Sequence, residues 1–220
     1  MKKATVRTVD TPHGEGRLHT RRATRPIATL LLSHGAGGGI ESRDLWALAD
    51  ALPAQGVSVV LFEQPWRVAG RKIATAPPTL DTALTRAADA MRVRTPLVVG
   101  GRSAGARSAA RTARSLGASG CLALSFPLHA PGKTEPTRLP ELRGVGLPTL
   151  LVQGERDPMG RPEEFPADLA GVDTVIIPGG DHGLKVPFGG EVTQDEAMGI
   201  VVESTLEWLV REVVGNRSYG

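Results

Sequence analysis

Three residues that could together perform acyl-transfer chemistry follow three separate apolar segments of the chain: Ser103, Asp157 and His182. A serine hydroxyl is a weak nucleophile until a neighbouring base removes its proton. The base, usually a histidine, needs a carboxylate that fixes its tautomer and stabilises the imidazolium that forms. These residue types therefore indicate nucleophilic catalysis through a serine, provided that the fold brings the three side chains together.

The serine lies in a Gly-x-Ser-x-Gly pattern. Residues 101–105 read Gly-Arg-Ser-Ala-Gly, directly after the apolar run 96–99, and an alanine-rich stretch, 104–116, continues to Gly117. The spacing predicts a strand, a sharp turn with the serine at its apex, and a helix, which is the context of a nucleophile elbow. Both glycines are expected because a Cβ at either position would clash in so tight a turn.

The histidine best placed to act as the base is His182. It lies in a glycine-flanked loop after the last apolar strand, where an imidazole can reach over a neighbouring loop. His13 and His19 fall in an exposed N-terminal hairpin, and His34 is expected to brace a loop rather than to take part in the chemistry.

The carboxylate that orients the base is predicted to be Asp157, just past the predicted strand 149–153. Glu155 in the same loop and Glu63 after an earlier strand are the alternatives. Asp181 is adjacent to His182, but neighbouring residues in a loop seldom face each other as an orienting pair needs, so Asp181 is interpreted as a turn carboxylate.

A tetrahedral intermediate also needs N–H donors aimed at its oxyanion. One is expected from the backbone of Ala104, the residue after the nucleophile. The second is expected from the loop 34–38, His-Gly-Ala-Gly-Gly, with Ala36 favoured over Gly37.

The elements that must position these residues alternate between apolar strands and amphipathic helices. This rhythm predicts βαβ units and a parallel sheet covered on both faces, with ligands bound at the carboxyl ends of the strands. The fold class is therefore α/β: a mostly parallel twisted sheet with helices on both faces, an N-terminal antiparallel hairpin and no substantial lid. Residues 1–220 are expected to form a single domain. The predicted hairpin strands are 5–9 and 17–23; the later strands are 27–32, 57–62, 97–99, 118–125, 149–153 and 172–177; the helices are 44–54, 79–93, 104–116, 163–169 and 193–213.

The composition of the 220-residue chain is that of an ordinary globular protein, with 40% hydrophobic and 22% charged residues and a net charge of +3. Only 4% of residues are aromatic and no basic run interleaves with aromatic residues, so nucleic acid is not an expected partner. No segment resembles a signal peptide or a membrane span, which predicts a soluble, cytoplasmic protein. The single cysteine, Cys121, excludes an intramolecular disulfide and lies in an apolar run.

No metal-ligand spacing, P-loop or dinucleotide fingerprint is present, so no metal and no cofactor are expected. The only candidate for a lid, residues 127–147, is short and proline-rich, which favours modest acyl substrates in an open site. Trp66 and Arg71, in the irregular basic loop 63–72, are candidate substrate-binding residues that would select a carboxylate- or phosphate-bearing ester; a solvated loop is the alternative. For Arg102, a structural ion pair is left open.

The sequence resembles an α/β-hydrolase over nearly its whole length, of the small lidless kind that is similar to dienelactone hydrolases. Residues 34–38, 100–105, 154–158 and 181–182 are most similar to a group that includes bacterial predicted hydrolases, an animal testis-expressed hydrolase-like protein and a subunit of the NSL histone-acetyltransferase complex. The resemblance implies a serine nucleophile at Ser103, an acid and a base, and it implies no particular substrate. Dienelactone-type enzymes usually carry a cysteine nucleophile, so their chemistry is not carried over.

The expected function is hydrolysis of a small-molecule ester or thioester through an acyl-enzyme. A non-catalytic binding or scaffolding protein with the same fold is the alternative, and a peptidase or acyltransferase that uses the same three residues is a further one. The oligomeric state is not readable from the sequence.

Overall fold

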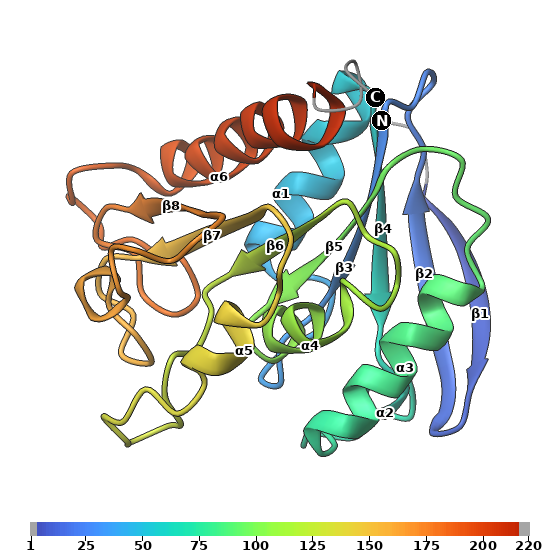
Figure 1. Ribbon diagram of the computed structural model, residues 1–220, viewed down its shortest axis with the longest axis horizontal. Helices are drawn as coiled ribbons and strands as arrows, with labels where there is room; N and C mark the ends of the chain where they lie inside the picture. The colour runs from blue at the N-terminus through green and yellow to red at the C-terminus, as the bar shows by residue number, and fades with distance from the viewer. Residues whose placement is uncertain (1–3, 216–220) are drawn as a thin grey trace.

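Eight strands form one sheet in the part of the chain that the computed structural model describes, residues 4–215 (Figure 1). Their order is β1-β2-β4-β3-β5-β6-β7-β8. From β4 through β3 to β8 all neighbours pair in parallel, whereas β1 pairs with β2, and β2 with β4, antiparallel. The predicted α/β fold with an N-terminal hairpin is confirmed. The strands are β1 (Thr5–Thr11), β2 (Gly14–Arg21), β3 (Ala28–Ser33), β4 (Val57–Glu63), β5 (Leu97–Arg102), β6 (Gly120–Leu124), β7 (Thr149–Gly154) and β8 (Val172–Ile177).

Helices cover both faces of the sheet. Figure 1 shows α1 (Arg43–Ala51) and α6 (Gln194–Trp208) on one face and α3 (Pro77–Asp89), α4 (Ala104–Thr112) and α5 (Leu139–Arg143) on the other. Each face has its own buried cluster: Leu30 and Leu32 of β3 pack into one and Leu31 into the other. Because successive side chains of a strand point to opposite faces, a central strand buried on both sides must be continuously apolar.

Two short helices interrupt segments that the sequence predicts to be irregular. Within residues 63–72 the chain forms α2 (Pro65–Val68), which has a proline in its first turn. Within residues 127–147 it forms α5, which also begins with a proline. A proline has no N–H to satisfy and its φ already suits the first turn, so these prolines mark helix starts rather than loop.

The helix predicted over residues 163–169 is wrong. The chain makes only a single 3-10 turn, Pro162–Glu164, and then becomes extended at Phe165, with φ −85° and ψ 136°. Phe165 precedes Pro166, and the proline ring disfavours helical geometry for the residue before it.

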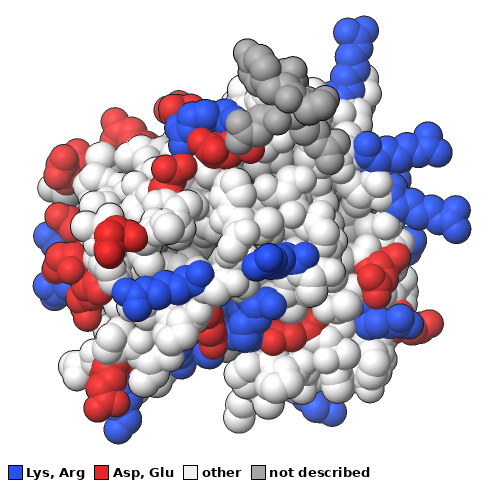
Figure 2. Space-filling model, viewed as in Figure 1, with Lys and Arg blue, Asp and Glu red and all other residues white. Residues whose placement is uncertain are grey.

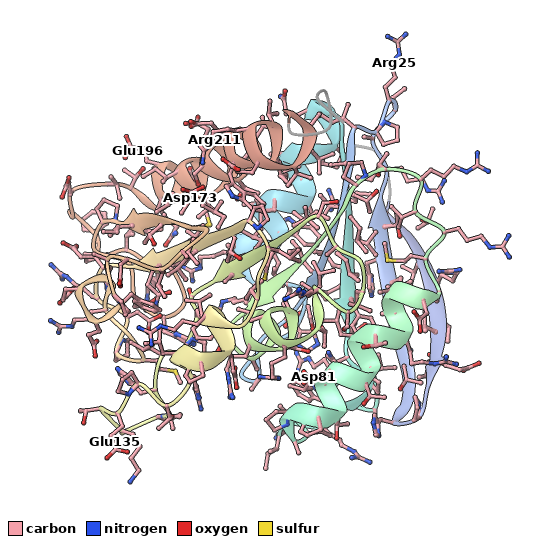
Figure 3. All side chains as sticks on the ribbon, viewed as in Figure 1. Arg25, Asp81, Glu135, Asp173, Glu196 and Arg211 are labelled. Carbon is pink, nitrogen blue, oxygen red and sulfur yellow. The ribbon has the colours of Figure 1, made fainter. Side chains whose placement is uncertain are left out.

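The C-terminal helix begins as predicted at a capping box, in which Thr193 and Glu196 satisfy each other's backbone N–H groups. The α-helical spacing ends at Trp208 and continues as a π-helical turn, Leu209–Val214. The i→i+5 bonds of that turn shift the later side chains around the axis, and Val210 is 47% exposed. Beside it Arg211 pairs with Asp173 of β8 at 2.7 Å (Figure 3).

Charged side chains lie mainly at the surface, where some of them pair between neighbouring helices. Asp81 extends from α3 toward α4 (Figure 3), where Arg111 donates to both of its carboxylate oxygens at 2.7 Å. On the face shown in Figure 2, cationic and acidic side chains of the described residues are interspersed, with uncharged surface between them. No helix within residues 4–215 combines the length and the apolar character that crossing a bilayer requires.

Candidate active site

Ser103 lies between β5 and α4 in a conformation that few non-glycine residues adopt. Its φ is 54° and its ψ is −113°. Such strain persists only where the surrounding structure enforces it, and it is typical of a nucleophile elbow. Ser125, at the end of β6, also has a positive φ of 47°, but it is fully buried and its hydroxyl does not face solvent.

The two glycines of the elbow are required by contacts with the neighbouring strand. A Cβ on Gly101 would lie 2.5 Å from the backbone oxygen of Ser33, and one on Gly105 would lie 2.2 Å from the same oxygen. Real Cβ atoms do not approach backbone oxygens so closely, so any larger residue would push β3 and β5 apart. The steric reason that the sequence predicts for the Gly-x-Ser-x-Gly pattern is confirmed, with the end of β3 as an additional partner.

The structure brings Ser103, His182 and Asp157 together in one hydrogen-bonded line. His182 Nε2 lies 2.8 Å from Ser103 Oγ, and His182 Nδ1 lies 2.8 Å from Asp157 Oδ2 and 3.0 Å from Oδ1. An ionised carboxylate only accepts hydrogen bonds, so Nδ1–H donates to Asp157 and Nε2 is free to accept the hydroxyl proton. The Asp157 side chain has no solvent exposure, whereas that of His182 is 22% exposed.

Asp157 is held by further donors that the sequence analysis did not identify. Gln153 Nε2 donates to Asp157 Oδ2 at 2.9 Å, and the backbone N–H of Met159 donates to Oδ1 at 2.8 Å. The same Gln153 amide donates to the backbone oxygens of Phe126 and Gly160, and three acceptors around one nitrogen fix its orientation. The sequence contains one signal for this role: Gln153 is a polar amide in a strand whose neighbouring residues are mainly apolar.

The alternative carboxylates have other partners. Glu155 accepts from the backbone N–H of Gly179 at 2.6 Å, and Glu63 pairs with His19 at 3.2 Å. Asp181 accepts from the backbone N–H groups of Gly183 and Lys185. None of the three contacts the imidazole of His182 among the described residues.

Arg102, the residue before the serine, forms a buried ion pair. Its Nε lies 3.2 Å from Oδ2 of Asp44, a fully buried residue in the first turn of α1, and its Nη2 donates to the backbone oxygen of His182 at 2.8 Å. The structural ion pair that the sequence left open is therefore present, and the side chain also contacts the loop that carries the histidine.

The glycine-rich loop after β3 lies against the serine. A Cβ on Gly35 would be 3.3 Å from Ser103 Cβ. Ala104 is the first residue of α4, so its backbone N–H is one of those that a helix leaves without an intrahelical acceptor. Ala36 is exposed in the loop beside it. Neither N–H donates to another group among residues 4–215.

His34 braces this loop from below, as predicted. Its Nε2 accepts from the backbone N–H of Gln64 at 3.0 Å and its Nδ1–H donates to the oxygen of Gly35 at 2.9 Å, while Trp66 packs edge-on at 5.4 Å. Burial lowers the pKa of His34 below its ordinary value, although the hydrogen bond to Gly35 opposes this. The neutral ring is the form that can accept from Gln64.

Trp66 and Arg71, the candidate substrate-binding residues, line a cavity of about 360 Å³ between α2 and the hairpin turn. Its lining includes neither Ser103 nor His182. Trp66 is only 4% exposed and mainly supports His34, whereas Arg71 is exposed.

Two remaining candidates for chemistry are the Cys121 thiol and clusters of metal-ligating side chains. Complete burial raises the pKa of the Cys121 thiol to about 12, so the reactive thiolate is not formed at neutral pH. Across residues 4–215, no three His, Cys, Asp or Glu side chains are grouped closely enough to hold a metal ion.

The sequence profile of a family described as an alpha/beta hydrolase domain matches residues 26–210. The chain belongs to this family. Comparison with curated proteins gives no match. This α/β-hydrolase is similar in structure to a lidless α/β serine hydrolase from Xanthomonas campestris, with a TM-score of 0.71 and 19% identity over 94% of this chain and 96% of that one.

Two further solved structures have the same fold. The dienelactone hydrolase of Anabaena variabilis gives a TM-score of 0.73 with 19% identity, and covers 96% of this chain and 98% of its own. Est1E from Butyrivibrio proteoclasticus gives 0.69 with 16% identity, and covers 96% and 100%. The predicted resemblance to small lidless hydrolases is confirmed for the fold, which at these identities is all that the likeness shows.

Proposed function

We propose that this α/β-hydrolase is a serine hydrolase of small esters or thioesters, with Ser103 as nucleophile, His182 as base and Asp157 as the orienting acid. The observation that carries the proposal is the 2.8 Å approach of His182 Nε2 to Ser103 Oγ, continued from Nδ1 to a carboxylate that is fully buried. Distances of this size are within hydrogen-bond reach, the geometric requirement for a base to take a proton.

The chemistry follows from which atom holds the proton. His182 Nε2 takes the Ser103 hydroxyl proton while Oγ bonds to the acyl carbon, and the carbonyl oxygen becomes an oxyanion. The backbone N–H groups of Ala104 and Ala36 stabilise that charge. Protonated His182 then gives its proton to the leaving oxygen or sulfur as that bond breaks, which leaves an acyl-enzyme. Water then attacks the acyl carbon while His182 takes its proton. The bond from Ser103 Oγ to the acyl carbon breaks, His182 returns the proton to Oγ, and the acid is released.

An open site supports small substrates. The connection that follows β6 contains only the five-residue helix α5, and Glu135 in that connection is exposed at the edge of the molecule (Figure 3). Est1E, which shares the fold, has been solved with ferulic acid bound. We infer that an aromatic or short-chain acyl group of similar size suits this site.

We also infer that the described residues belong to one domain that extends over residues 1–220. Of these, residues 1–3 and 216–220 lie outside the described part.

The decisive experiment is labelling with a fluorophosphonate probe at neutral pH, comparing the native protein with Ser103→Ala. We expect one adduct on native protein, mapped by mass spectrometry to Ser103, and none on the variant. Absence of an adduct on native protein would instead favour a binding or scaffolding role, and an adduct on another serine would refute the site. A series of p-nitrophenyl esters of increasing acyl length then measures the size limit.

Selection of acidic substrates by Arg71 remains a prediction with its own test. Because Arg71 is exposed beside the cavity next to α2, Arg71→Ala should raise KM for a carboxylate-bearing ester and leave KM for a neutral ester unchanged. If Arg71→Ala had the same KM as the native protein for the carboxylate-bearing ester as well as for the neutral one, the prediction would be refuted.

A further inference from the structure

Arg102 contacts each of the three parts that must be aligned around Ser103. Its guanidinium lies 3.2 Å from Asp44 in α1 and donates to the backbone oxygen of His182 at 2.8 Å. A Cβ placed on Gly35 of the glycine-rich loop would lie 3.2 Å from Arg102 Nη1. Because Arg102 directly precedes Ser103 in the chain, its position is fixed by the same strand that fixes the nucleophile.

Within residues 4–215, the ionic partner of Asp44 is Arg102. Asp44 is fully buried. Among the described residues its Oδ1 accepts only from the backbone N–H of Leu45, and its Oδ2, which accepts no hydrogen bond, lies 3.2 Å from Arg102 Nε. A buried ion pair is costly to desolvate and is weak evidence of a gain in stability. The Arg102 guanidinium is planar and always charged, so an ion pair at its Nε fixes the direction in which its Nη2 donates. The pair therefore directs a donor at one chosen carbonyl.

That carbonyl belongs to a glycine-rich loop whose turn is closed by hydrogen bonds of Asp181. Residues 179–183 read Gly-Gly-Asp-His-Gly, and Gly179 has a φ of +65°. Glycine backbones adopt many conformations, so the loop must be held by its contacts. The backbone N–H of Arg156 and the carboxylate of Glu155 hold its beginning, at Gly180 and Gly179. Asp181 closes the turn after the histidine, and Arg102 adds a contact from outside the loop to the backbone oxygen of His182 itself.

We propose that Arg102 is a positioning residue for the base: it fixes the backbone of His182, while Asp157 fixes the ring. The inference rests on the proposed function, since it assigns Arg102 a role in that chemistry. His182 is then fixed at its ring and its main chain, so its Nε2 stays 2.8 Å from the Ser103 hydroxyl.

The test uses a matched pair of arginines. Arg138 donates to the backbone oxygen of His129 at 2.9 Å, as Arg102 does to that of His182, but His129 does not contact Ser103. We expect Arg102→Met to lower kcat for p-nitrophenyl acetate by about 10- to 100-fold with KM unchanged, since displacing a reacting group by about 1 Å costs on the order of 100-fold. Arg102→Lys should be intermediate because an ammonium lacks the planar fork. Arg138→Met should leave kcat unchanged.

Removing Arg102 alone leaves Asp44 buried without a partner, and the variant could fail to fold. The double variant Asp44→Asn/Arg102→Met removes both charges and should fold, with the same loss in kcat. Hydrogen exchange of the amides of residues 181–185 should accelerate in this double variant and not in Arg138→Met. This second readout does not depend on any catalytic activity.

The two readouts separate the inference from the proposed function. If native protein shows no probe adduct and no esterase activity but exchange accelerates, the proposed function fails and Arg102 still holds the loop. If native protein is active and the folded double variant keeps its kcat, or if exchange is unchanged, the positioning role is refuted.

Discussion

Of the three histidine–carboxylate pairs within residues 4–215, the two that follow strands β6 to β8 are built in opposite ways. In the pair His182–Asp157 the acid is fully buried and the histidine is 22% exposed. In the pair His129–Glu164 the histidine side chain is 5% exposed and the acid is 37% exposed. The distances are alike, 2.8 Å and 2.9 Å, so proximity alone does not distinguish a catalytic pair from a structural one.

The two pairs differ in the surroundings of the ring nitrogen that does not face the carboxylate. His182 Nε2 meets a strained, partly exposed serine, whereas His129 Nδ1 is buried and has no hydrogen-bond partner among the described residues. The backbone N–H of Arg161 and, to a smaller extent, His129 hold the pKa of Glu164 below its ordinary value, although burial opposes this. A base needs a buried acid behind it and an accessible nucleophile in front, and only the first pair has both.

The largest expected effect comes from removing each acid in turn. Asp157→Asn should lower kcat by about 10⁴-fold, because an amide can no longer hold the tautomer in which Nε2 accepts the serine proton. Glu164→Gln should leave kcat unchanged. Steady-state kinetics with p-nitrophenyl acetate measure both.

The controls are the Ser103→Ala background and circular dichroism of each variant. A large fall in kcat for a folded Glu164→Gln protein would break the distinction between the two pairs, and so would an active Asp157→Asn protein.

Gln153→Leu should lower kcat by less than Asp157→Asn does, and it tests whether Gln153 helps to hold the buried carboxylate of Asp157. Asp157 Oδ2 would lose the 2.9 Å bond but keep His182 Nδ1, whereas the backbone oxygens of Gly160 and Phe126 would lose their donor. Unpaired buried acceptors cost about 1–3 kcal/mol each, so the unfolding free energy from urea titration should fall by about that amount. We also expect kcat to fall, though by less than in Asp157→Asn. Lower stability with an unchanged kcat would mean that Gln153 supports only the fold.

The three residues that the structure brings together, Ser103, Asp157 and His182, could be proposed from the sequence because each is marked locally, by a strand end, a glycine-flanked loop or the Gly-x-Ser-x-Gly spacing. The sequence did not predict Gln153, Asp44 or the direction of Arg102. Those roles depend on which strands and helices become neighbours. Asp44 and Arg102 are brought together where the first turn of α1 meets the end of β5, and no local pattern records that contact. The short helices α2 and α5 were missed because proline was interpreted as loop.

A third histidine, His34, sharpens the comparison because it has no carboxylate partner and is kept neutral by burial. The unfolded chain, with an ordinary histidine pKa of about 6.5, binds a proton at higher pH than the folded protein does. This contribution to stability is therefore complete above about pH 6.5 and is lost as the pH falls through the lower pKa of the folded state. Urea midpoints should fall more steeply below pH 6.5 in native protein than in His34→Gln. Parallel pH profiles would contradict this.

The smallest expected effect is that of His129→Leu, and it tests the comparison from its structural side. Leucine fills the buried position and removes the unpaired Nδ1, while Glu164, which is 37% exposed, can be solvated once its partner is gone. A hydrogen bond contributes about 0.5–1.5 kcal/mol net, and the loss is partly offset by the buried leucine, so thermal and urea unfolding should show a change of at most about 1 kcal/mol, and kcat should be unchanged. His182→Leu, by contrast, removes the base and should abolish probe labelling. If folded His129→Leu also lost labelling, the pair His129–Glu164 would have to take part in the chemistry. Whether the acid or the histidine of a pair is the buried member would then not distinguish a catalytic pair from a structural one.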